Sequence, residues 1–248
     1  MKPKKILQKI IIFLLISLLI GVAIFVLWAN SIYQADPEKL SSVRTNSSFI
    51  ITEKPGYFQI SPSNCDAGCE RGLIFYPGAK VDPKAYFYKL SGLATKEYGK
   101  VKIFITKPTL NLAFFGVNQG NDIINDQPEI KSWSIGGHSL GGAMSCEFLK
   151  NNPQQVKKLI LIGSYCASDL SKFNIDVLTI HGDLDKVLSN EKLTENAKNL
   201  PQSTIDIPLK GMNHAQAGNY GEQEGDQKAT LDDDAVKQQI LSQFKGVL

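Results

Sequence analysis

The sequence predicts an α/β domain with a mostly parallel sheet and helices on both faces. Apolar runs typical of buried strands, such as Gly72–Pro77 (GLIFYP), alternate with segments whose apolar residues recur at helical spacing. This alternation is the pattern of βαβ units, in which each crossover helix packs onto the sheet. One stretch near the N-terminus, Ile10–Trp28, is apolar throughout and predicts a membrane span outside the domain.

The elements of this domain are expected from Gly56 onward. Strands at 56–60 and 72–77 come first, and Asp82 then begins a helix as its N-cap, with Pro83 at the first helical position. The last helix opens with three aspartates, which suit the positive end of a helix dipole. Between them we expect strands at 100–106, 132–137, 156–165, 173–182 and 203–211, and helices at 121–130, 140–152, 189–200 and 232–244.

Three regions follow from this pattern: a basic head and membrane segment over 1–30, a stalk or linker over 31–55, and the α/β domain over 56–248. At about 1.5 Å per residue, the run Ile10–Trp28 nearly matches a hydrocarbon core of roughly 30 Å. A cleavable signal peptide is the alternative, because Ala29 and Ser31 are small residues at a suitable distance. Signal peptides usually have a shorter apolar core of about 7–15 residues, so an uncleaved signal anchor is expected.

The charges around this segment predict its orientation. Basic residues precede the apolar run and none follows it closely, so the positive-inside rule places the N-terminus in the cytoplasm and the domain outside it. Without the four head lysines, the 27 basic residues fall to 23 against 24 acidic ones, a net charge of −1. This balance gives no indication of the strongly basic surface that nucleic-acid binding needs, so no nucleic-acid partner is expected. The head lysines are Lys2, Lys4, Lys5 and Lys9.

The four cysteines leave two questions open. Cys65 and Cys69 lie in a turn-rich loop where a small disulfide is plausible, and too few neighbouring ligands are present for a metal site. Cys146 and Cys166 lie in apolar segments, where buried free thiols are expected, although a bond between them stays open. A domain of this size does not need disulfides to form its core.

Ser139 is the candidate nucleophile. It stands in Gly137-His138-Ser139-Leu140-Gly141, a G-x-S-x-G sequence between an expected strand and an expected helix. In this context the serine sits on a sharp strand-to-helix turn, and its neighbours two positions away must be small. The alternative is a structural role, in which Ser139 only caps the helix that follows.

A nucleophilic serine needs a base and an acid that orients the base. His214 follows the last expected strand, and we expect it to be the base. The acid comes from the loop after the preceding strand, where Asp185 is chosen over Asp183. The chain order Ser139, Asp185, His214 is the one found in α/β-hydrolases. Of the other two histidines, His138 should point away from Ser139 and His181 should pack at a strand end.

The tetrahedral intermediate also needs N–H donors for its oxyanion. The backbone amide of Leu140, directly after the nucleophile, is one expected donor. The second is expected from the loop after the strand 72–77, at Ala79. Lys80 next to it is expected to be a solvated residue at the mouth of the site.

From about Gly72 to Phe244 the chain resembles the α/β-hydrolase superfamily, and more narrowly a small, lidless bacterial branch related to dienelactone hydrolases and carboxylesterases. The segments that carry the resemblance are FYPGAKVDPKAY, PTLNLAFFGVNQGND, IGGHSLGGAM, HGDLD and GMNHAQAGNYG. The resemblance implies a triad of Ser139, His214 and Asp185 and no metal or organic cofactor. Dienelactone hydrolases use a cysteine nucleophile and are soluble, so their substrate does not carry over.

The sequence places few limits on the substrate. Only about ten residues separate the strand ending at Tyr165 from the next one, which leaves no room for a cap domain. Asn111, Phe114 and Tyr220 are candidates to wall an acyl pocket, although apolar loop residues more often pack on the core. We therefore expect a membrane-anchored esterase for a small or lipid-like acyl compound. A thioesterase, an amidase, an acyltransferase on envelope components or a non-catalytic binding module are the alternatives, and the oligomeric state is open.

Overall fold

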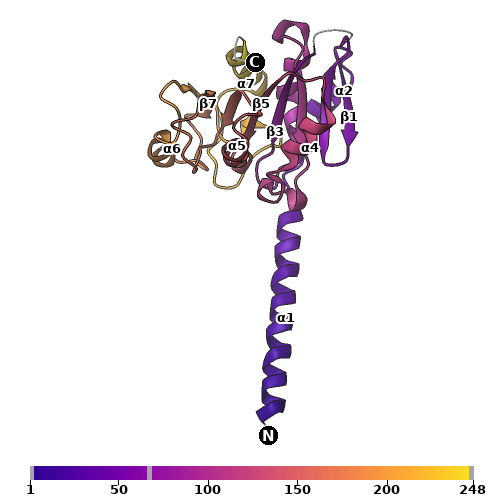
Figure 1. Ribbon diagram of the computed structural model, residues 1–248, viewed down its shortest axis with the longest axis vertical. Helices are drawn as coiled ribbons and strands as arrows, with labels where there is room; N and C mark the ends of the chain where they lie inside the picture. The colour runs from indigo at the N-terminus through magenta and orange to yellow at the C-terminus, as the bar shows by residue number, and fades with distance from the viewer. Residues whose placement is uncertain (1–2, 66–68, 246–248) are drawn as a thin grey trace.

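The structure is a computed structural model that describes residues 3–65 and 69–245 of the 248-residue chain. It consists of one long N-terminal helix, α1 (Pro3–Asn30), and an α/β domain at the C-terminal end of that helix (Figure 1). The helix α1 is long and apolar enough to cross a membrane, and its large apolar side chains from Ile6 to Trp28 are exposed.

The domain is built on an eight-stranded sheet with the order β1-β2-β4-β3-β5-β6-β7-β8. From β4 to β8 neighbouring strands run parallel, and β1 and β2 add an antiparallel edge. The strands are β1 (Phe49–Lys54), β2 (Tyr57–Pro62), β3 (Arg71–Tyr76), β4 (Lys102–Thr106), β5 (Ser132–His138), β6 (Lys158–Ile162), β7 (Asp176–Gly182) and β8 (Ile205–Leu209).

Helices cover both faces of this sheet, as the sequence predicts. Alternate residues of β3 enter different cores: Leu73 and Phe75 pack with α2, α3 and α7, whereas Ile74 and Tyr76 pack with α4 and α5. In Figure 1, α4, α5 and α6 lie on the side of the sheet from which α1 projects, and α7 lies on the other side. The helices are α2 (Pro37–Arg44), α3 (Phe87–Leu90), α4 (Gln119–Asp126), α5 (Leu140–Asn151), α6 (Asn190–Ala197) and α7 (Asp233–Phe244).

The segment 31–55 differs from the expected stalk. It forms the helix α2, capped by Asp36, and the edge strand β1, which pairs with β2 along its whole length. Most of β1 is exposed, so its sequence lacks the apolar alternation that would mark a strand. The folded domain therefore begins within the segment expected to be a linker.

The helix expected after Asp82 is broken into short pieces. Asp82 caps it by accepting a hydrogen bond from the Lys84 N–H, but α3 extends only over Phe87–Leu90 and is flanked by 3₁₀ turns at Pro83–Tyr86 and Ser91–Ala94. A Cβ atom at Gly92 would lie 2.5 Å from the Leu241 side chain, so α7 packs closely against this turn. Tertiary packing, not propensity, determines the local structure here.

Both cysteine pairs are disulfides in the structure. Cys65 is bonded to Cys69, and Cys146 of α5 is bonded to Cys166, which follows β6. The expectation of free thiols at Cys146 and Cys166 is therefore wrong, because the fold brings two apolar segments together at a Cα–Cα distance of 5.6 Å.

Candidate active site

Ser139 lies on a sharp turn between β5 and α5. Its backbone has φ 52° and ψ −124°, a strained conformation for a residue with a side chain. The turn needs glycines around it: a Cβ atom at Gly137 would lie 2.5 Å from the Gly141 carbonyl carbon, and one at Gly141 would lie 2.1 Å from the Tyr76 carbonyl oxygen. The strain at Ser139 is held by this close packing, and the turn places the serine side chain at the carboxyl end of β5, where a nucleophile is expected.

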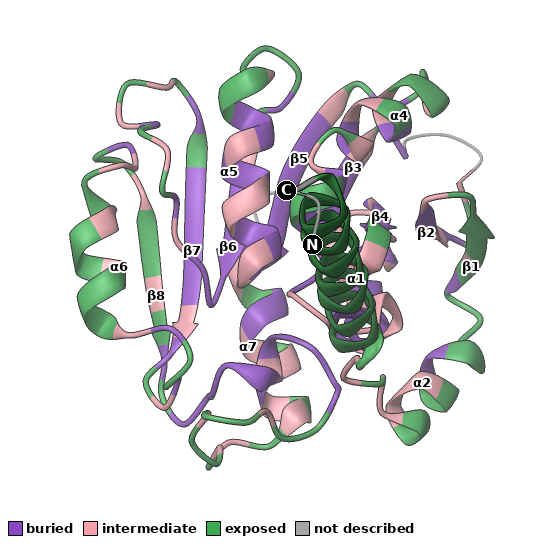
Figure 2. Ribbon diagram, turned by 90° about the horizontal axis from the view of Figure 1, so that it is seen from below, coloured by how far each residue is buried: buried purple, intermediate pink, exposed green. Residues whose placement is uncertain are grey.

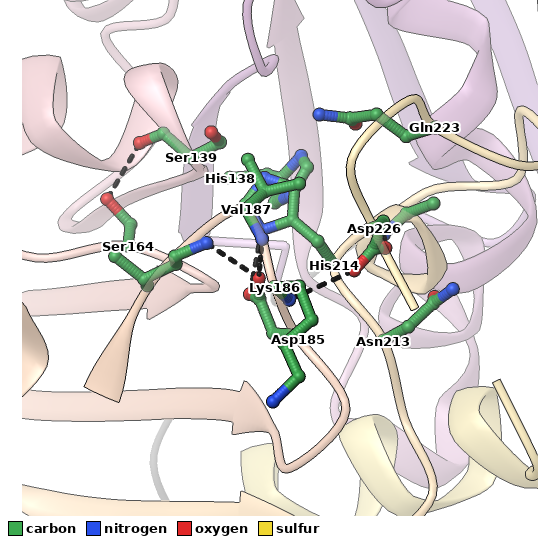
Figure 3. Close-up of polar contacts among 12 residues, drawn as sticks. His138, Ser139, Ser164, Asp185, Lys186, Val187, Asn213, His214, Gln223 and Asp226 are labelled. Carbon is green, nitrogen blue, oxygen red and sulfur yellow. Dashed lines mark hydrogen bonds and ion pairs between the residues drawn. The ribbon is translucent and has the colours of Figure 1, made fainter. Parts of the chain in front are cut away.

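His214 and Asp185 form a buried pair. Nδ1 of His214 lies 2.7 Å from Oδ2 of Asp185, and their side chains are only 1% and 3% exposed (Figure 3). The other carboxylate oxygen, Oδ1, accepts hydrogen bonds from the backbone N–H groups of Val187 and Leu188. The carboxylate is therefore fixed on both sides, and the pair can hold the imidazole in one tautomer.

Asp183 makes a different contact. Its Oδ1 accepts the N–H of Gly211, 2.6 Å away, and the residue is exposed. Of the two aspartates in the loop after β7, only Asp185 contacts His214.

Ser139 and His214 line one cavity of about 220 Å³. Nε2 of His214, the nitrogen that faces away from Asp185, is buried and has no hydrogen-bond partner among the described residues. This is the nitrogen that must accept a proton if the histidine acts as a base. The cavity is also lined by Leu140, Ala143, Gly163, Ser164, Tyr165, Val187, Leu188 and Lys192.

The two expected oxyanion donors lie at neighbouring backbone segments. Gly141 packs against the carbonyl oxygens of Tyr76 and Pro77, which brings the start of α5 beside the chain that leads to Ala79. In the described part of the chain, the N–H groups of Ala79 and Leu140 donate to no other acceptor. An oxyanion hole formed by these two N–H groups stays a prediction.

A buried hydrogen-bond chain links this loop to the turn at Ser139. The hydroxyl of Tyr86 accepts the N–H of Gly78 at 2.9 Å and is hydrogen-bonded to Nδ1 of His138, also at 2.9 Å. Burial, and to a smaller extent the electrostatic effect of the neighbouring His214 ring, keep the pKa of His138 well below its usual value. His138 thus supports the site through Tyr86, although its ring centroid is only 4.4 Å from that of His214.

The residues expected to bind substrate do not line this cavity. Asn111 uses its side chain to donate to the carbonyl oxygen of Ala29 at the end of α1, and Phe114 is 65% exposed. Tyr220 is buried near His138, and its hydroxyl donates to Gln223. Burial raises the pKa of the Tyr220 phenol above its usual value. The sequence places these residues near the site but does not show which way their side chains point.

Sequence reasoning missed two polar residues around the site. Ser164 donates to the carbonyl oxygen of Ser139 at 2.7 Å. Asp226 accepts the N–H groups of Lys186 and Ala215, so it joins the loop that carries Asp185 to the loop that carries His214 (Figure 3). Asp226 lies in the loop GEQEGDQK, which has no motif to mark it.

A larger cavity of about 760 Å³ lies between α6, β7 and β8. It shares Ser164 and Tyr165 with the cavity at Ser139, so the two are neighbours. Its wall carries apolar side chains from α6 and the segment after it, Leu193, Ala197, Leu200 and Pro201. His181, expected to be a packed strand-end residue, faces this cavity and contacts Asp206 at 3.4 Å.

Between β6 and β7, residues 163–175 contain no helix or strand, so no cap domain is inserted there. Within residues 3–65 and 69–245, no group of three or more His, Cys, Asp or Glu side chains is placed to hold a metal ion.

Comparison with known proteins places the fold. The family model described as "Alpha/beta hydrolase family" matches residues 72–238. Among solved structures, a predicted CIB-like hydrolase from Thermoplasma acidophilum has a TM-score of 0.59 at 12% identity, covering 80% of this chain and 99% of that one. The carboxylesterase CesB from Bacillus subtilis has a TM-score of 0.56 at 13% identity, covering 84% and 95%.

Est1E from Butyrivibrio proteoclasticus has a TM-score of 0.56 at 12% identity, covering 81% of this chain and 97% of that one. No curated protein matches the sequence. At these identities the solved structures show the fold alone, and the family model covers more than half of the chain. The chain belongs to the alpha/beta hydrolase family.

Proposed function

We propose that this protein is a membrane-anchored serine hydrolase that cleaves carboxylic esters. The observation that carries the proposal is the 2.7 Å contact between His214 and Asp185, with His214 lining the same cavity as Ser139 on its strained turn. A serine, a histidine whose second nitrogen is unpartnered, and a buried carboxylate are the three groups that acyl transfer to a serine requires.

The reaction proceeds in two steps, acylation of the serine and hydrolysis of the acyl-serine. Ser139 Oγ attacks the acyl carbonyl carbon while its proton passes to Nε2 of His214, and the N–H groups of Ala79 and Leu140 stabilise the oxyanion. The histidine then gives that proton to the leaving alcohol as the ester bond breaks, which leaves an acyl-serine. Water attacks the acyl-serine with His214 again as the base, releasing a carboxylic acid and the free serine.

An open site beside a cavity of about 760 Å³ suits an acyl chain better than a small, fully enclosed metabolite. The apolar wall formed by Leu193, Ala197 and Leu200 is the proposed acyl site. Thioesters and amides use the same groups, so thioesterase, amidase and acyltransferase activities are the alternatives within this mechanism. Among the structurally similar proteins, CesB is a carboxylesterase and another is an esterase domain from Rhodothermus marinus, and these two names favour esters.

The proposed location is the membrane, with the catalytic domain outside the cytoplasm. Lysines precede the apolar part of α1, and the two disulfides fit an oxidising compartment. A protease added to intact cells should then remove the domain, and full protection from protease would reverse the proposed orientation.

A fluorophosphonate probe tests the enzyme proposal on the full chain in detergent micelles. The wild type and Ser164→Ala should be labelled, because Ser164 lines the same cavity but offers no partner base. Ser139→Ala should not be labelled. Absence of labelling in the wild type, or labelling that persists in Ser139→Ala, would favour the non-catalytic binding module.

A further inference from the structure

The end of α1 is fixed to the catalytic domain and not joined to it through a flexible stalk. Ala29 is fully buried, and its carbonyl oxygen accepts the side-chain N–H of Asn111 at 3.2 Å. Lys80 places its ammonium 4.7 Å from the ring centroid of Trp28. The backbone of Tyr33 then pairs with the chain on both sides of Val81.

The two loops that hold α1 are also tied to each other. The N–H of Lys80 donates to the carbonyl oxygen of Asn111 at 2.8 Å. Lys80, Leu110 and Asn111 all have positive φ angles, from 55° to 59°, which residues with side chains adopt only where their surroundings enforce it. The axis of α1 therefore has a defined direction relative to the domain. The plane of a membrane that α1 crosses is consequently also oriented relative to the domain.

Two exposed aromatic residues lie on the same loop as Asn111. Phe114 is 65% exposed and Phe115 49%, and their rings contact each other edge to face. The apolar run of α1 ends at Trp28, a residue type that marks the membrane interface. Since Asn111 contacts the residue after Trp28, Phe114 and Phe115 lie near the level of that interface.

The cavity at Ser139 lies on the same side of the molecule. It is bordered by Leu140 and Ala143 of α5 and by Lys192 of α6. Both helices lie on the side of the sheet from which α1 projects, as the view along α1 from below shows (Figures 1 and 2). Ala79, the expected oxyanion donor, directly precedes Lys80, which contacts Trp28.

We propose that Phe114 and Phe115 insert into the bilayer interface next to α1, and that the site hydrolyses acyl esters of lipids in that same membrane leaflet. The second half rests on the proposed serine hydrolase function. The rigid anchor holds the domain with α5 and α6 toward the lipid, so an acyl chain reaches Ser139 without crossing water. An exposed aromatic pair lowers solubility in water and marks an interaction site. The anchor α1 already places this pair next to a lipid surface, which is therefore the proposed partner.

The insertion is measured on the full chain in vesicles of phosphatidylcholine and phosphatidylglycerol. Phe115→Cys is labelled with an environment-sensitive nitrobenzoxadiazole dye, which is specific because the described cysteines are all in disulfides. The matched control is Ile205→Cys, an equally exposed position at the amino end of β8. We expect a spin-labelled lipid to quench the dye at 115 and aqueous iodide to quench it at 205. Iodide quenching at both positions would overturn the insertion. The aromatic pair would then be interpreted as a contact surface for a protein partner.

The substrate is tested with two esters and one pair of variants. Phe115→Glu should lose about tenfold in hydrolysis of a fluorogenic glycerolipid ester within the vesicle, and should hydrolyse a short water-soluble ester like the wild type. Ile205→Glu should match the wild type on both esters. Equal lipid hydrolysis by Phe115→Glu and the wild type would overturn the proposal, while wild type inactive on both esters would overturn the hydrolase function instead. The dye measurement decides the insertion in either case.

Discussion

Nδ1 of His214 lies 2.7 Å from Oδ2 of Asp185, and the contact is closed to solvent. Asp185 approaches from the loop after β7 and His214 from the loop after β8, so the pair depends on two neighbouring strands ending at the same edge. Gly163 lies against both side chains: a Cβ atom there would be 3.2 Å from Nδ1 of His214 and 3.4 Å from Oδ2 of Asp185. The close packing leaves the imidazole little freedom to rotate.

Asp185→Asn should lower kcat by about 10³- to 10⁴-fold on a soluble ester, because an amide favours the wrong tautomer of His214. Asp183→Asn is the matched control. Among the described residues its side chain accepts only the Gly211 N–H, and an amide oxygen can still accept it, so activity should stay within a few-fold of the wild type. Steady-state kinetics on both variants measure the difference, and a larger loss in Asp183→Asn would transfer the role of the acid to Asp183.

Tyr86→Phe should reduce kcat by about tenfold with little change in KM, because the Gly78 N–H and Nδ1 of His138 both lose their partner next to the oxyanion loop. Tyr76→Phe is the matched control, because it also removes one buried, hydrogen-bonded tyrosine hydroxyl. Its buried hydroxyl donates to Val117 and accepts from Gly120 on the other face of the sheet.

Both variants should lose similar thermal stability, while only Tyr86→Phe should slow labelling by the fluorophosphonate probe. A matching loss of labelling rate in Tyr76→Phe would indicate a general effect of destabilisation and remove Tyr86 from the site.

Asp226→Asn should lower kcat clearly while changing the free energy of unfolding little. One of the N–H groups of Lys186 and Ala215 would then face an amide NH₂ instead of a carboxylate oxygen. The loops carrying Asp185 and His214 would then separate, and the acidic limb of the kcat/KM profile should shift as His214 loses its partner. Glu224→Gln, an exposed change in the same loop, should leave the profile where it is. An unchanged pH profile in Asp226→Asn would limit Asp226 to a structural role.

The sequence predicted Ser139 and Asp185 as candidates because they follow the buried strands β5 and β7, which have a strong apolar signal. The strand β8 before His214 is mostly exposed, so that candidate depended on the small number of histidines and on the chain order. It did not predict β1, whose exposed edge carries no such signal, or the bond between Cys146 and Cys166, which depends on how α5 packs beside the chain after β6. The sequence also did not predict the direction of the Phe114 side chain. An apolar loop residue gives the same sequence pattern whether it faces a pocket, the core or a membrane, and only the contact of Asn111 with α1 distinguishes these environments.

A buried lysine supports the loop after His214 and predicts a pH-dependent stability. Lys89 Nζ donates to the carbonyl oxygen of Gly218, to Asn219 and to Asp233, with the side chain 1% exposed. Burial lowers the pKa of Lys89 to about 8, and the charge of Asp233 opposes this shift only in part.

In the unfolded chain Lys89 titrates near 10.5, so between about pH 8 and 10.5 the unfolded state binds more protons than the folded state. Stability therefore rises with pH in this window, by a total of about 3 kcal/mol from this group. Lys89→Met lacks the titration, so the free energy of unfolding of the wild type minus that of Lys89→Met should increase from pH 8 to 10.5. Urea unfolding of both proteins at a series of pH values measures this difference, and a flat or falling difference would mean that Asp233 and the two oxygen acceptors keep Lys89 charged throughout.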